Sequence, residues 1–143
     1  MKRRAARPVD YRLGAPGLVL DAGALIALEA RNIRLLADLT RAHRLGLPIR
    51  IPAGCIAQAW RGGPRSASLA RLLKQPCTVV QVDERSAKEV GEFLARVRHD
   101  GEKADVVDAH VALVARATRS LVWTSDPDDM TRYQVDADFV RTV

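Results

Sequence analysis

Short, largely apolar runs alternate with longer segments of helical periodicity along this chain of 143 residues. Such runs predict strands at residues 18–20, 49–51, 77–82 and 120–124, with a last strand at 137–140. A short apolar run between turn signals is typical of a strand buried on both faces, as in parallel sheets. The pattern therefore predicts a sheet that lies inside the molecule.

Segments that favour helices separate these strands. They cover residues 24–30, 35–42, 53–60, 69–73, 90–97 with an end near Gly101, 105–118 and 129–133. Within several of them apolar residues recur at spacings of three and four, as on one face of a helix. Ser66 is a predicted N-cap of the fourth helix, and Asp83 or Ser86 of the fifth. Because strands alternate with helices, we expect an α/β fold with a mainly parallel sheet of four to five strands.

Length and composition fit one compact domain. A chain of this size can bury a substantial core. Apolar residues make up 48% of it and aromatic residues only 4%, so the core should be aliphatic. Residues 1–16 contain Pro8, Gly14 and Pro16 and lack apolar periodicity. We interpret them as a basic arm or linker, and residues 17–143 as the folded domain.

Targeting signals are not apparent in the sequence. No apolar run reaches the roughly 20 residues that cross a bilayer, and no apolar signal-peptide segment follows the basic N-terminus. Cys55 and Cys77 lack metal-ligand spacing, and their apolar surroundings favour reduced core residues. We therefore expect a cytoplasmic protein without membrane contact.

Positive charge is concentrated near the N-terminus. Residues 1–16 carry five basic side chains and one acidic side chain, a net charge of +4, which leaves +2 of the total +6 for residues 17–143. Basic surfaces attract phosphate backbones independently of base sequence. A solvated tail that aids solubility explains the same charge, so both interpretations stay open.

Four aspartates are expected to meet at one edge of the sheet. The strand at 18–20 ends at Asp21, and the strand at 120–124 is followed by Asp126. The helix at 105–118 opens with Asp105 and Asp108, whose spacing of three places them side by side. The carboxyl ends of parallel strands form one edge, where the active sites of open α/β sheets lie.

Carboxylates gathered at one edge repel one another, so an opposite charge must balance them. A hard cation such as Mg²⁺ suits a set of oxygen ligands. Such a cation activates water and stabilises charge during phosphoryl displacement, so the residues favour phosphodiester hydrolysis. Each acid also has a structural interpretation. Asp105 can be an N-cap with Asp108 as its reciprocal partner, and Asp126 can be part of a turn.

Three motifs give the chain a resemblance to a known family. They are Val19-Leu20-Asp21, Asp108-Ala109-His110-Val111-Ala112 and Thr124-Ser125-Asp126-Pro127-Asp128-Asp129-Met130. Residues 17–140 resemble a PIN domain, and more narrowly the VapC-type ribonuclease toxins of prokaryotic toxin–antitoxin pairs. The resemblance implies a three-layer α/β/α sandwich, dependence on Mg²⁺ or Mn²⁺ and endoribonuclease activity on RNA. It also implies a homodimer and a cognate antitoxin bound along a groove.

The resemblance extends to individual site residues. It implies that Asp21, Asp108 and Asp126 are catalytic, metal-coordinating acids. The family usually has a glutamate where this chain has Gln58, whose amide carbonyl accepts a hydrogen bond but carries no negative charge. Asp105, one helical turn from Asp108, is the candidate to supply the missing charge as a further metal ligand.

Several neighbours of these acids are auxiliary candidates. Thr124 and Asp129 belong to the third motif. Arg61 and Arg65 are candidate contacts to RNA phosphates, although solvated charges at a helix end explain them equally well. The family often has a hydroxyl residue two positions after its first aspartate, where this chain has Gly23.

The residues leave more than one function open. The first is a metal-dependent endoribonuclease, expected to be the toxin of a toxin–antitoxin pair. The alternative is a PIN-like module with weak or absent catalysis that binds RNA or an antitoxin, which Gln58 favours. A phosphatase or a DNA nuclease would use the same acids.

Overall fold

The computed structural model describes residues 14–97 and 105–143. Most of the predicted basic arm and the predicted helix end near Gly101 lie outside these ranges. The elements, with η for a 3₁₀ helix, are β1 (Leu18–Leu20), α1 (Ala22–Glu29), α2 (Ile33–Leu45), β2 (Ile49–Pro52), α3 (Ala53–Ala59), η2 (Gly63–Ser66), α4 (Ala67–Leu73), β3 (Thr78–Val80), α5 (Glu84–Val97), α6 (Val106–Thr118), β4 (Leu121–Thr124), α7 (Pro127–Arg132), η3 (Ala137–Phe139) and β5 (Val140–Thr142).

The strands pair in parallel in the order β3-β2-β1-β4-β5. β1 lies at the centre, where Leu18 is in register with Ile49 of β2 and with Leu121 of β4. The predicted α/β class is confirmed, and every strand of the described residues joins the parallel sheet.

The last strand begins later than the apolar pattern predicts. The pattern predicts a strand at 137–140, whereas residues Ala137–Phe139 form a 3₁₀ turn. Asp136 Oδ1 accepts a hydrogen bond from the backbone N–H of Asp138 over 2.9 Å, which favours this turn. β5 follows it and pairs Val140 with Val122 of β4. A local side-chain bond therefore overrides the apolar pattern here.

Polar side chains set several helix starts, in part as predicted. Asp83 and Ser86 cap α5 together: the Ser86 N–H donates to Asp83 Oδ1 over 2.8 Å, and the Asp83 N–H donates to Ser86 Oγ over 2.9 Å. This reciprocal pair is a capping box. Ser66 stands at the predicted N-cap position of α4, but its side chain does not cap the helix, because its hydroxyl accepts hydrogen bonds from the N–H groups of Arg61 and Gly62. The turn η2 leads into α4 without a side-chain cap.

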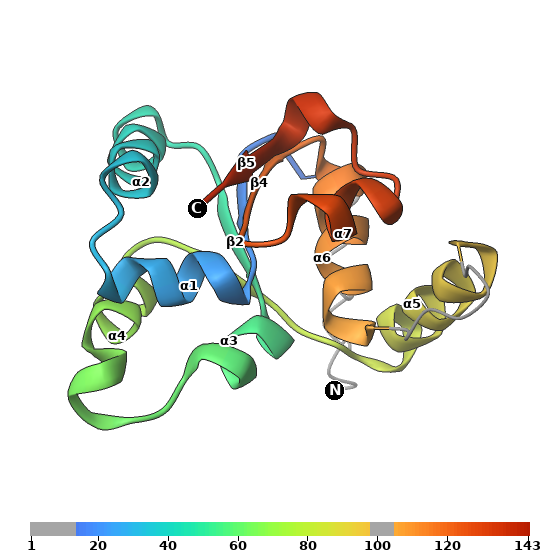
Figure 1. The fold of residues 1–143 in the computed structure, drawn as a ribbon, viewed down its shortest axis with the longest axis horizontal. Helices are drawn as coiled ribbons and strands as arrows, with labels where there is room; N and C mark the ends of the chain where they lie inside the picture. The colour runs from blue at the N-terminus through green and yellow to red at the C-terminus, as the bar shows by residue number, and fades with distance from the viewer. Residues whose placement is uncertain (1–13, 98–104) are drawn as a thin grey trace, which may run out of the picture.

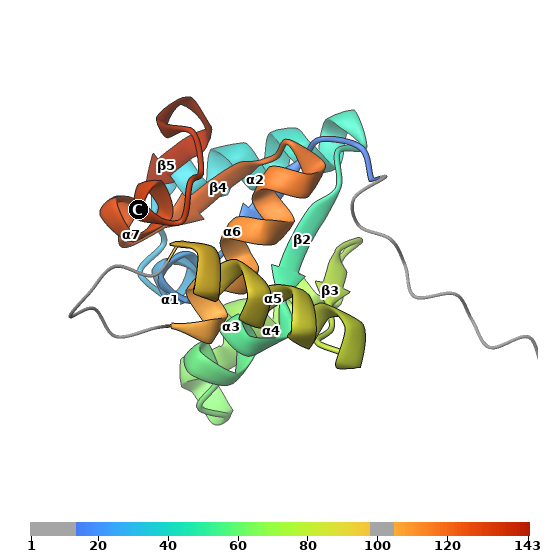
Figure 2. The ribbon, with the colours of Figure 1, turned by 90° about the vertical axis from the view of Figure 1, so that its right-hand side faces the viewer.

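Helices cover both faces of the sheet. Figure 1 shows α1, α2, α3 and α4 on one side and α5, α6 and α7 on the other. In the turned view α5 lies outside α6, which places α6 between α5 and the sheet (Figure 2). This is the three-layer α/β/α arrangement that the resemblance implies.

The core is aliphatic, as the composition predicts. Val19 and Leu20 of β1 are fully buried, and α6 buries Ala109, Val111 and Ala115 on different sides. α6 is buried more widely than one apolar stripe because the sheet covers one side of it and α5 covers another. Each fully buried large aliphatic side chain contributes roughly 1.5–3 kcal/mol. Among the helices described, none has the length and apolar character needed to cross a bilayer.

Candidate active site

The acid cluster, as we call Asp21, Asp105, Asp108, Asp126 and Asp129, lies at the carboxyl edge of the sheet. Leu20 of β1 is in register with Trp123 of β4, so both strands end at the same level. The chain then turns into α1 after β1 and into α7 after β4. The start of α6 reaches the same edge, since the other four members all act electrostatically on Asp108.

Asp21 is the most buried member of the acid cluster, with 5% of its surface exposed. Its Oδ1 accepts a hydrogen bond from the N–H of Ala24 over 2.8 Å and so caps α1. The N–H groups of Gly23 and Ser125 and the hydroxyl of Thr124 also bond to this carboxylate. Burial raises the pKa of Asp21, while these hydrogen bonds oppose the shift. The carboxylate is therefore held in one orientation.

Thr124 connects the ends of the two strands. Its side chain is fully buried, and its hydroxyl bonds to the Asp21 carboxylate. The same oxygen accepts the N–H of Asp126 over 2.9 Å. A hydroxyl can donate once and accept at the same time. Thr124 therefore fixes Asp21 and the backbone of Asp126 relative to each other.

Asp105 caps α6, which confirms its structural interpretation in part. Its Oδ1 accepts the N–H of Asp108 over 3.0 Å. The reciprocal half of the predicted pair is wrong, because the N–H of Asp105 donates to the hydroxyl of Tyr133 over 3.3 Å. The Asp108 carboxylate is therefore not used in capping α6.

Asp108 is the member of the acid cluster whose pKa is raised most. Its pKa is raised to about 7, first by burial and then by Asp105, Asp129, Asp21 and Asp126. Like charges this close disfavour the ionised form, and a bound cation reverses that effect. Asp108 therefore exchanges its proton in the neutral pH range unless a cation offsets the neighbouring acids.

Asp126 and Asp129 complete the acid cluster from α7, which begins at Pro127 rather than at the predicted residue 129. Asp126 Oδ1 caps this helix by accepting the N–H of Asp129 over 3.2 Å. Burial and the adjacent Asp126 carboxyl raise the pKa of Asp129, and Arg132 opposes the shift through an ion pair of 2.7 Å. Asp126 is therefore a helix N-cap, rather than part of a turn as in its structural interpretation, and this role is compatible with a place in the acid cluster.

The donor chemistry of the acid cluster fits a hard cation. Every member offers carboxylate oxygens, the ligands that Mg²⁺ and Mn²⁺ prefer. Within the described residues, no group of three aspartate, glutamate, histidine or cysteine side chains is arranged so that it could hold a metal ion. Mg²⁺ usually keeps several waters and takes only one or two carboxylates. The oxygen donors of Asp21, Asp108 and Asp126 are therefore compatible in kind with a partly hydrated cation.

Cys55 of α3 lies fully buried beside the acid cluster. Burial, Asp21 and Asp108 all raise the pKa of its thiol. A cysteine binds metal as the thiolate. Cys55 is therefore a neutral core residue at the base of the site, as its apolar surroundings in the sequence predict.

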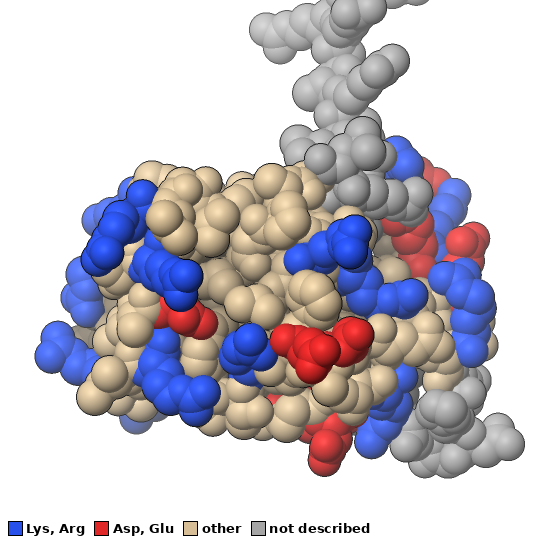
Figure 3. Space-filling view, turned by 90° about the horizontal axis from the view of Figure 1, so that it is seen from above, with Lys and Arg blue, Asp and Glu red and all other residues tan. Residues whose placement is uncertain are grey.

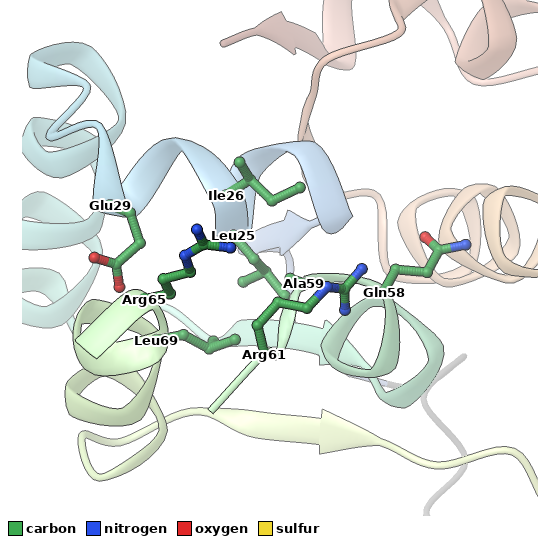
Figure 4. A pocket seen from close by; sticks show the side chains of 8 residues that line it. All are labelled: Leu25, Ile26, Glu29, Gln58, Ala59, Arg61, Arg65 and Leu69. Carbon is green, nitrogen blue, oxygen red and sulfur yellow. The ribbon is translucent and has the colours of Figure 1, made fainter. Parts of the chain in front are cut away.

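Gln58, Arg61 and Arg65 lie together around a separate pocket of about 390 Å³ between α1, α3 and α4. Figure 4 shows Glu29 and Arg65 toward one end of this pocket and Gln58 at the other. The Gln58 side chain is exposed and makes no hydrogen bond to another described residue, while its backbone belongs to the helix α3. The structure thus joins the two candidate RNA contacts to Gln58 and places all three in this pocket.

Two residues near the acid cluster are absent from the sequence-based candidates. Ser125 bonds through its N–H to Asp21, and its position between Thr124 and Asp126 is the signal that points to it. Tyr133 holds the start of α6 through its hydroxyl. It is 28 residues from Asp105 in sequence, and no local motif connects the two.

Comparison with known proteins gives matches among solved structures. No family model and no curated protein matches the chain. The crystal structure of Mycobacterium tuberculosis VapC20, a sarcin-ricin loop cleaving toxin, matches with a TM-score of 0.53 and 20% identity over 77% of this chain and 92% of that chain. FitAB bound to an IR36 DNA fragment matches with a TM-score of 0.58 and 16% identity, over 87% and 94%. The chain therefore has the fold of VapC-like PIN-domain proteins.

Proposed function

We propose that the protein is a metal-dependent endoribonuclease that hydrolyses RNA phosphodiester bonds at the acid cluster. The observation that carries the proposal is the gathering of five carboxylates from three segments, where burial and then the four neighbouring acids raise the pKa of Asp108 to about 7. Such crowding is typical of a site that binds a cation or exchanges a proton. The shared fold with VapC20, described as a sarcin-ricin loop cleaving toxin, supports RNA as the substrate.

In this proposal Asp21, Asp108 and Asp126 hold Mg²⁺ or Mn²⁺, and Asp105 and Asp129 add negative charge. A bound cation of this kind activates water and stabilises charge on the phosphoryl group. Asp21 is prepared for this role because four hydrogen bonds fix its carboxylate before any ligand binds. Asp108 is the member of the acid cluster that gains or loses a proton near neutral pH. It binds the cation in its ionised form.

The surface supports a polyanionic substrate. The full chain carries a net charge of +6, and basic side chains are spread over the face shown in Figure 3, with smaller acidic groups between them. We propose that Arg61 and Arg65 bind RNA phosphates from the pocket between α1, α3 and α4. Basic side chains of this kind give sequence-independent attraction, which the acid cluster by itself would oppose.

We further propose that the protein is the toxin of a toxin–antitoxin pair, acts in the cytoplasm and pairs as a homodimer. The match to FitAB supports a protein partner of the antitoxin type. Both cysteines are free thiols, which suits a reducing compartment. Exposed apolar side chains on α1 and α2, including Ile26 and Ile33, offer surface for a protein partner or a second copy.

Cleavage of RNA by the purified full chain in the presence of Mg²⁺ tests the enzyme proposal. We expect Asp21→Asn to lower the rate about a hundredfold, because it removes one charge from a cation site. Asp136→Asn is the matched control: Asp136 caps η3, and asparagine caps equally well. Equal rates for the unchanged chain and Asp21→Asn would contradict the proposal.

Gln58 favours the alternative of a binding module with weak or no catalysis, because it contributes no charge and lies exposed at the separate pocket between α1, α3 and α4. Calorimetry with Mg²⁺ and Mn²⁺ separates the two functions. A nuclease should bind either cation and lose binding in Asp21→Asn. RNA binding without any cation binding would favour the module.

A further inference from the structure

Gly23 of α1 lies directly against the side chain of Ser125, which follows β4. A β-carbon at position 23 would lie 2.1 Å from Ser125 Oγ and 2.4 Å from Ser125 Cβ. Both separations are far below van der Waals contact. Any side chain at position 23 therefore excludes Ser125 from the place that it occupies.

The backbone does not explain the glycine. The glycines with positive φ are Gly46, Gly62 and Gly63 in the described residues, so Gly23 has a conformation open to every residue. It is the second residue of α1, where glycine weakens a helix relative to alanine. The presence of a glycine at position 23 is explained by the space that the Ser125 side chain needs.

The fold does not explain the Ser125 hydroxyl either. Ser125 is exposed, and its hydroxyl makes no hydrogen bond to any other described residue. Its backbone N–H bonds to the Asp21 carboxylate, so the residue is anchored at the acid cluster while the hydroxyl stays available. Thr124 and Asp126 on either side are also fixed by hydrogen bonds. The structure thus holds an unused hydroxyl beside the acids.

Once its carboxylates are ionised, the acid cluster has no hydrogen-bond donor of its own. Ionised carboxylates only accept hydrogen bonds, and the oxygens of a phosphodiester are acceptors as well. A hydroxyl donates without adding charge. We propose that the Ser125 hydroxyl donates a hydrogen bond to a phosphate oxygen of the bound RNA, and that Gly23 leaves the space that the Ser125 side chain occupies. This inference rests on the proposed nuclease function.

Binding of RNA to the full chain tests this role, with Asp108→Asn as the background so that the RNA stays intact. The probe is a labelled RNA oligonucleotide of mixed sequence, followed by fluorescence anisotropy with Mg²⁺ present. Adding Ser125→Ala should weaken binding about tenfold or more, the usual loss for one hydrogen bond to a charged group. Unchanged affinity would overturn the proposal.

Two double variants separate the hydroxyl from the space it fills. Gly23→Ser with Ser125→Gly transfers a hydroxyl to the neighbouring position, whereas Gly23→Ala with Ser125→Gly fills the same space without one. We expect the first pair to bind RNA more tightly than the second. Equal affinity of the two pairs would assign Ser125 a packing role and overturn the proposal.

The cleavage assay keeps the two proposals apart. If Asp21→Asn cleaves RNA as fast as the unchanged chain, the nuclease function fails whatever Ser125 does. If cleavage depends on Asp21, but Ser125→Ala matches the unchanged chain in both RNA affinity and cleavage rate, then only the proposed role of Ser125 fails and the nuclease function stands.

Discussion

Three aspartates of the acid cluster are helix N-caps, and this second role explains how so many carboxylates coexist. Asp21 caps α1, Asp105 caps α6 and Asp126 caps α7. The positive end of a helix dipole and the free N–H groups stabilise a carboxylate at each of these positions. Asp108 caps nothing, and it is the residue whose pKa is raised to about 7.

The raised pKa of Asp108 predicts a dependence of stability on pH. The unfolded chain ionises this residue near the ordinary value of 3.8, whereas the folded chain holds the proton to about pH 7. Between these values the folded state binds more protons, so the free energy of unfolding falls as the pH rises. The stabilising contribution is complete below about pH 4 and is lost above about pH 7.

Asp108→Asn removes this titration. We expect the variant to exceed the unchanged chain in free energy of unfolding by about 1–2 kcal/mol near pH 8 and to equal it near pH 4, since solvent screening reduces the full effect. Urea unfolding at both pH values, with chelator present, measures the difference. Mg²⁺ should narrow it by stabilising the ionised form of the unchanged chain. A constant difference across the pH range would contradict the prediction.

At the scale of elements, α6 joins the core to the acid cluster. Its middle is buried between the sheet and α5, and its first turn carries Asp105 and Asp108 to the carboxyl edge. Tyr133, just after α7, bonds to the N–H of Asp105. Packing of one helix and capping of its end therefore place two of the five carboxylates.

A matched pair of variants at Asp105 separates capping from charge. Asparagine keeps the cap but removes the charge, whereas alanine removes both. We expect Asp105→Ala to lower the free energy of unfolding by about 1 kcal/mol relative to Asp105→Asn. Both should lower the pKa of Asp108, because Asp105 is the charged neighbour that raises it most. Carboxyl NMR titration reports that pKa, and no shift in either variant would contradict the electrostatic part.

At the scale of the whole molecule, the pocket with Arg61 and Arg65 and the acid cluster are supported by the same helix layer. α1 begins beside Asp21, and its residues Leu25, Ile26 and Glu29 line the pocket. RNA bound to the acid cluster, as the proposed function requires, would therefore extend toward these positive side chains. Such contacts release counterions and make affinity depend on salt.

Arg61→Gln and Arg65→Gln test this geometry. Each should reduce the slope of log affinity against log salt concentration by about 1, the change expected for one lost phosphate contact. Arg96→Gln is the control, because Arg96 is exposed on α5, across the sheet from the pocket. Anisotropy titrations of labelled RNA over a range of salt concentrations give the slopes. Equal slopes for all three variants would place the RNA elsewhere.

Local sequence patterns were sufficient to predict the elements and caps that depend on short-range contacts. The strand at 18–20 and the helix at 105–118 follow from apolar periodicity, and the caps at Asp83 and Asp105 from residue type. The same local chemistry explains where the structure departs from the predictions. Asp136 closes a turn where apolar residues predict a strand. Ser66 stands at the N-cap of α4, but its hydroxyl accepts a hydrogen bond from Arg61 instead of capping the helix.

The sequence by itself determined the α/β class, the parallel sheet and the expectation that aspartates gather at its carboxyl edge, because strand ends and helix starts follow from local periodicity. Only the tertiary structure decided how those acids act on one another. The pKa of Asp108 depends first on burial and then on four carboxylates brought near it by folding. The contact of Gly23 with Ser125 joins residues a hundred positions apart. Burial and through-space charge are properties of the packed chain, and no local pattern encodes them.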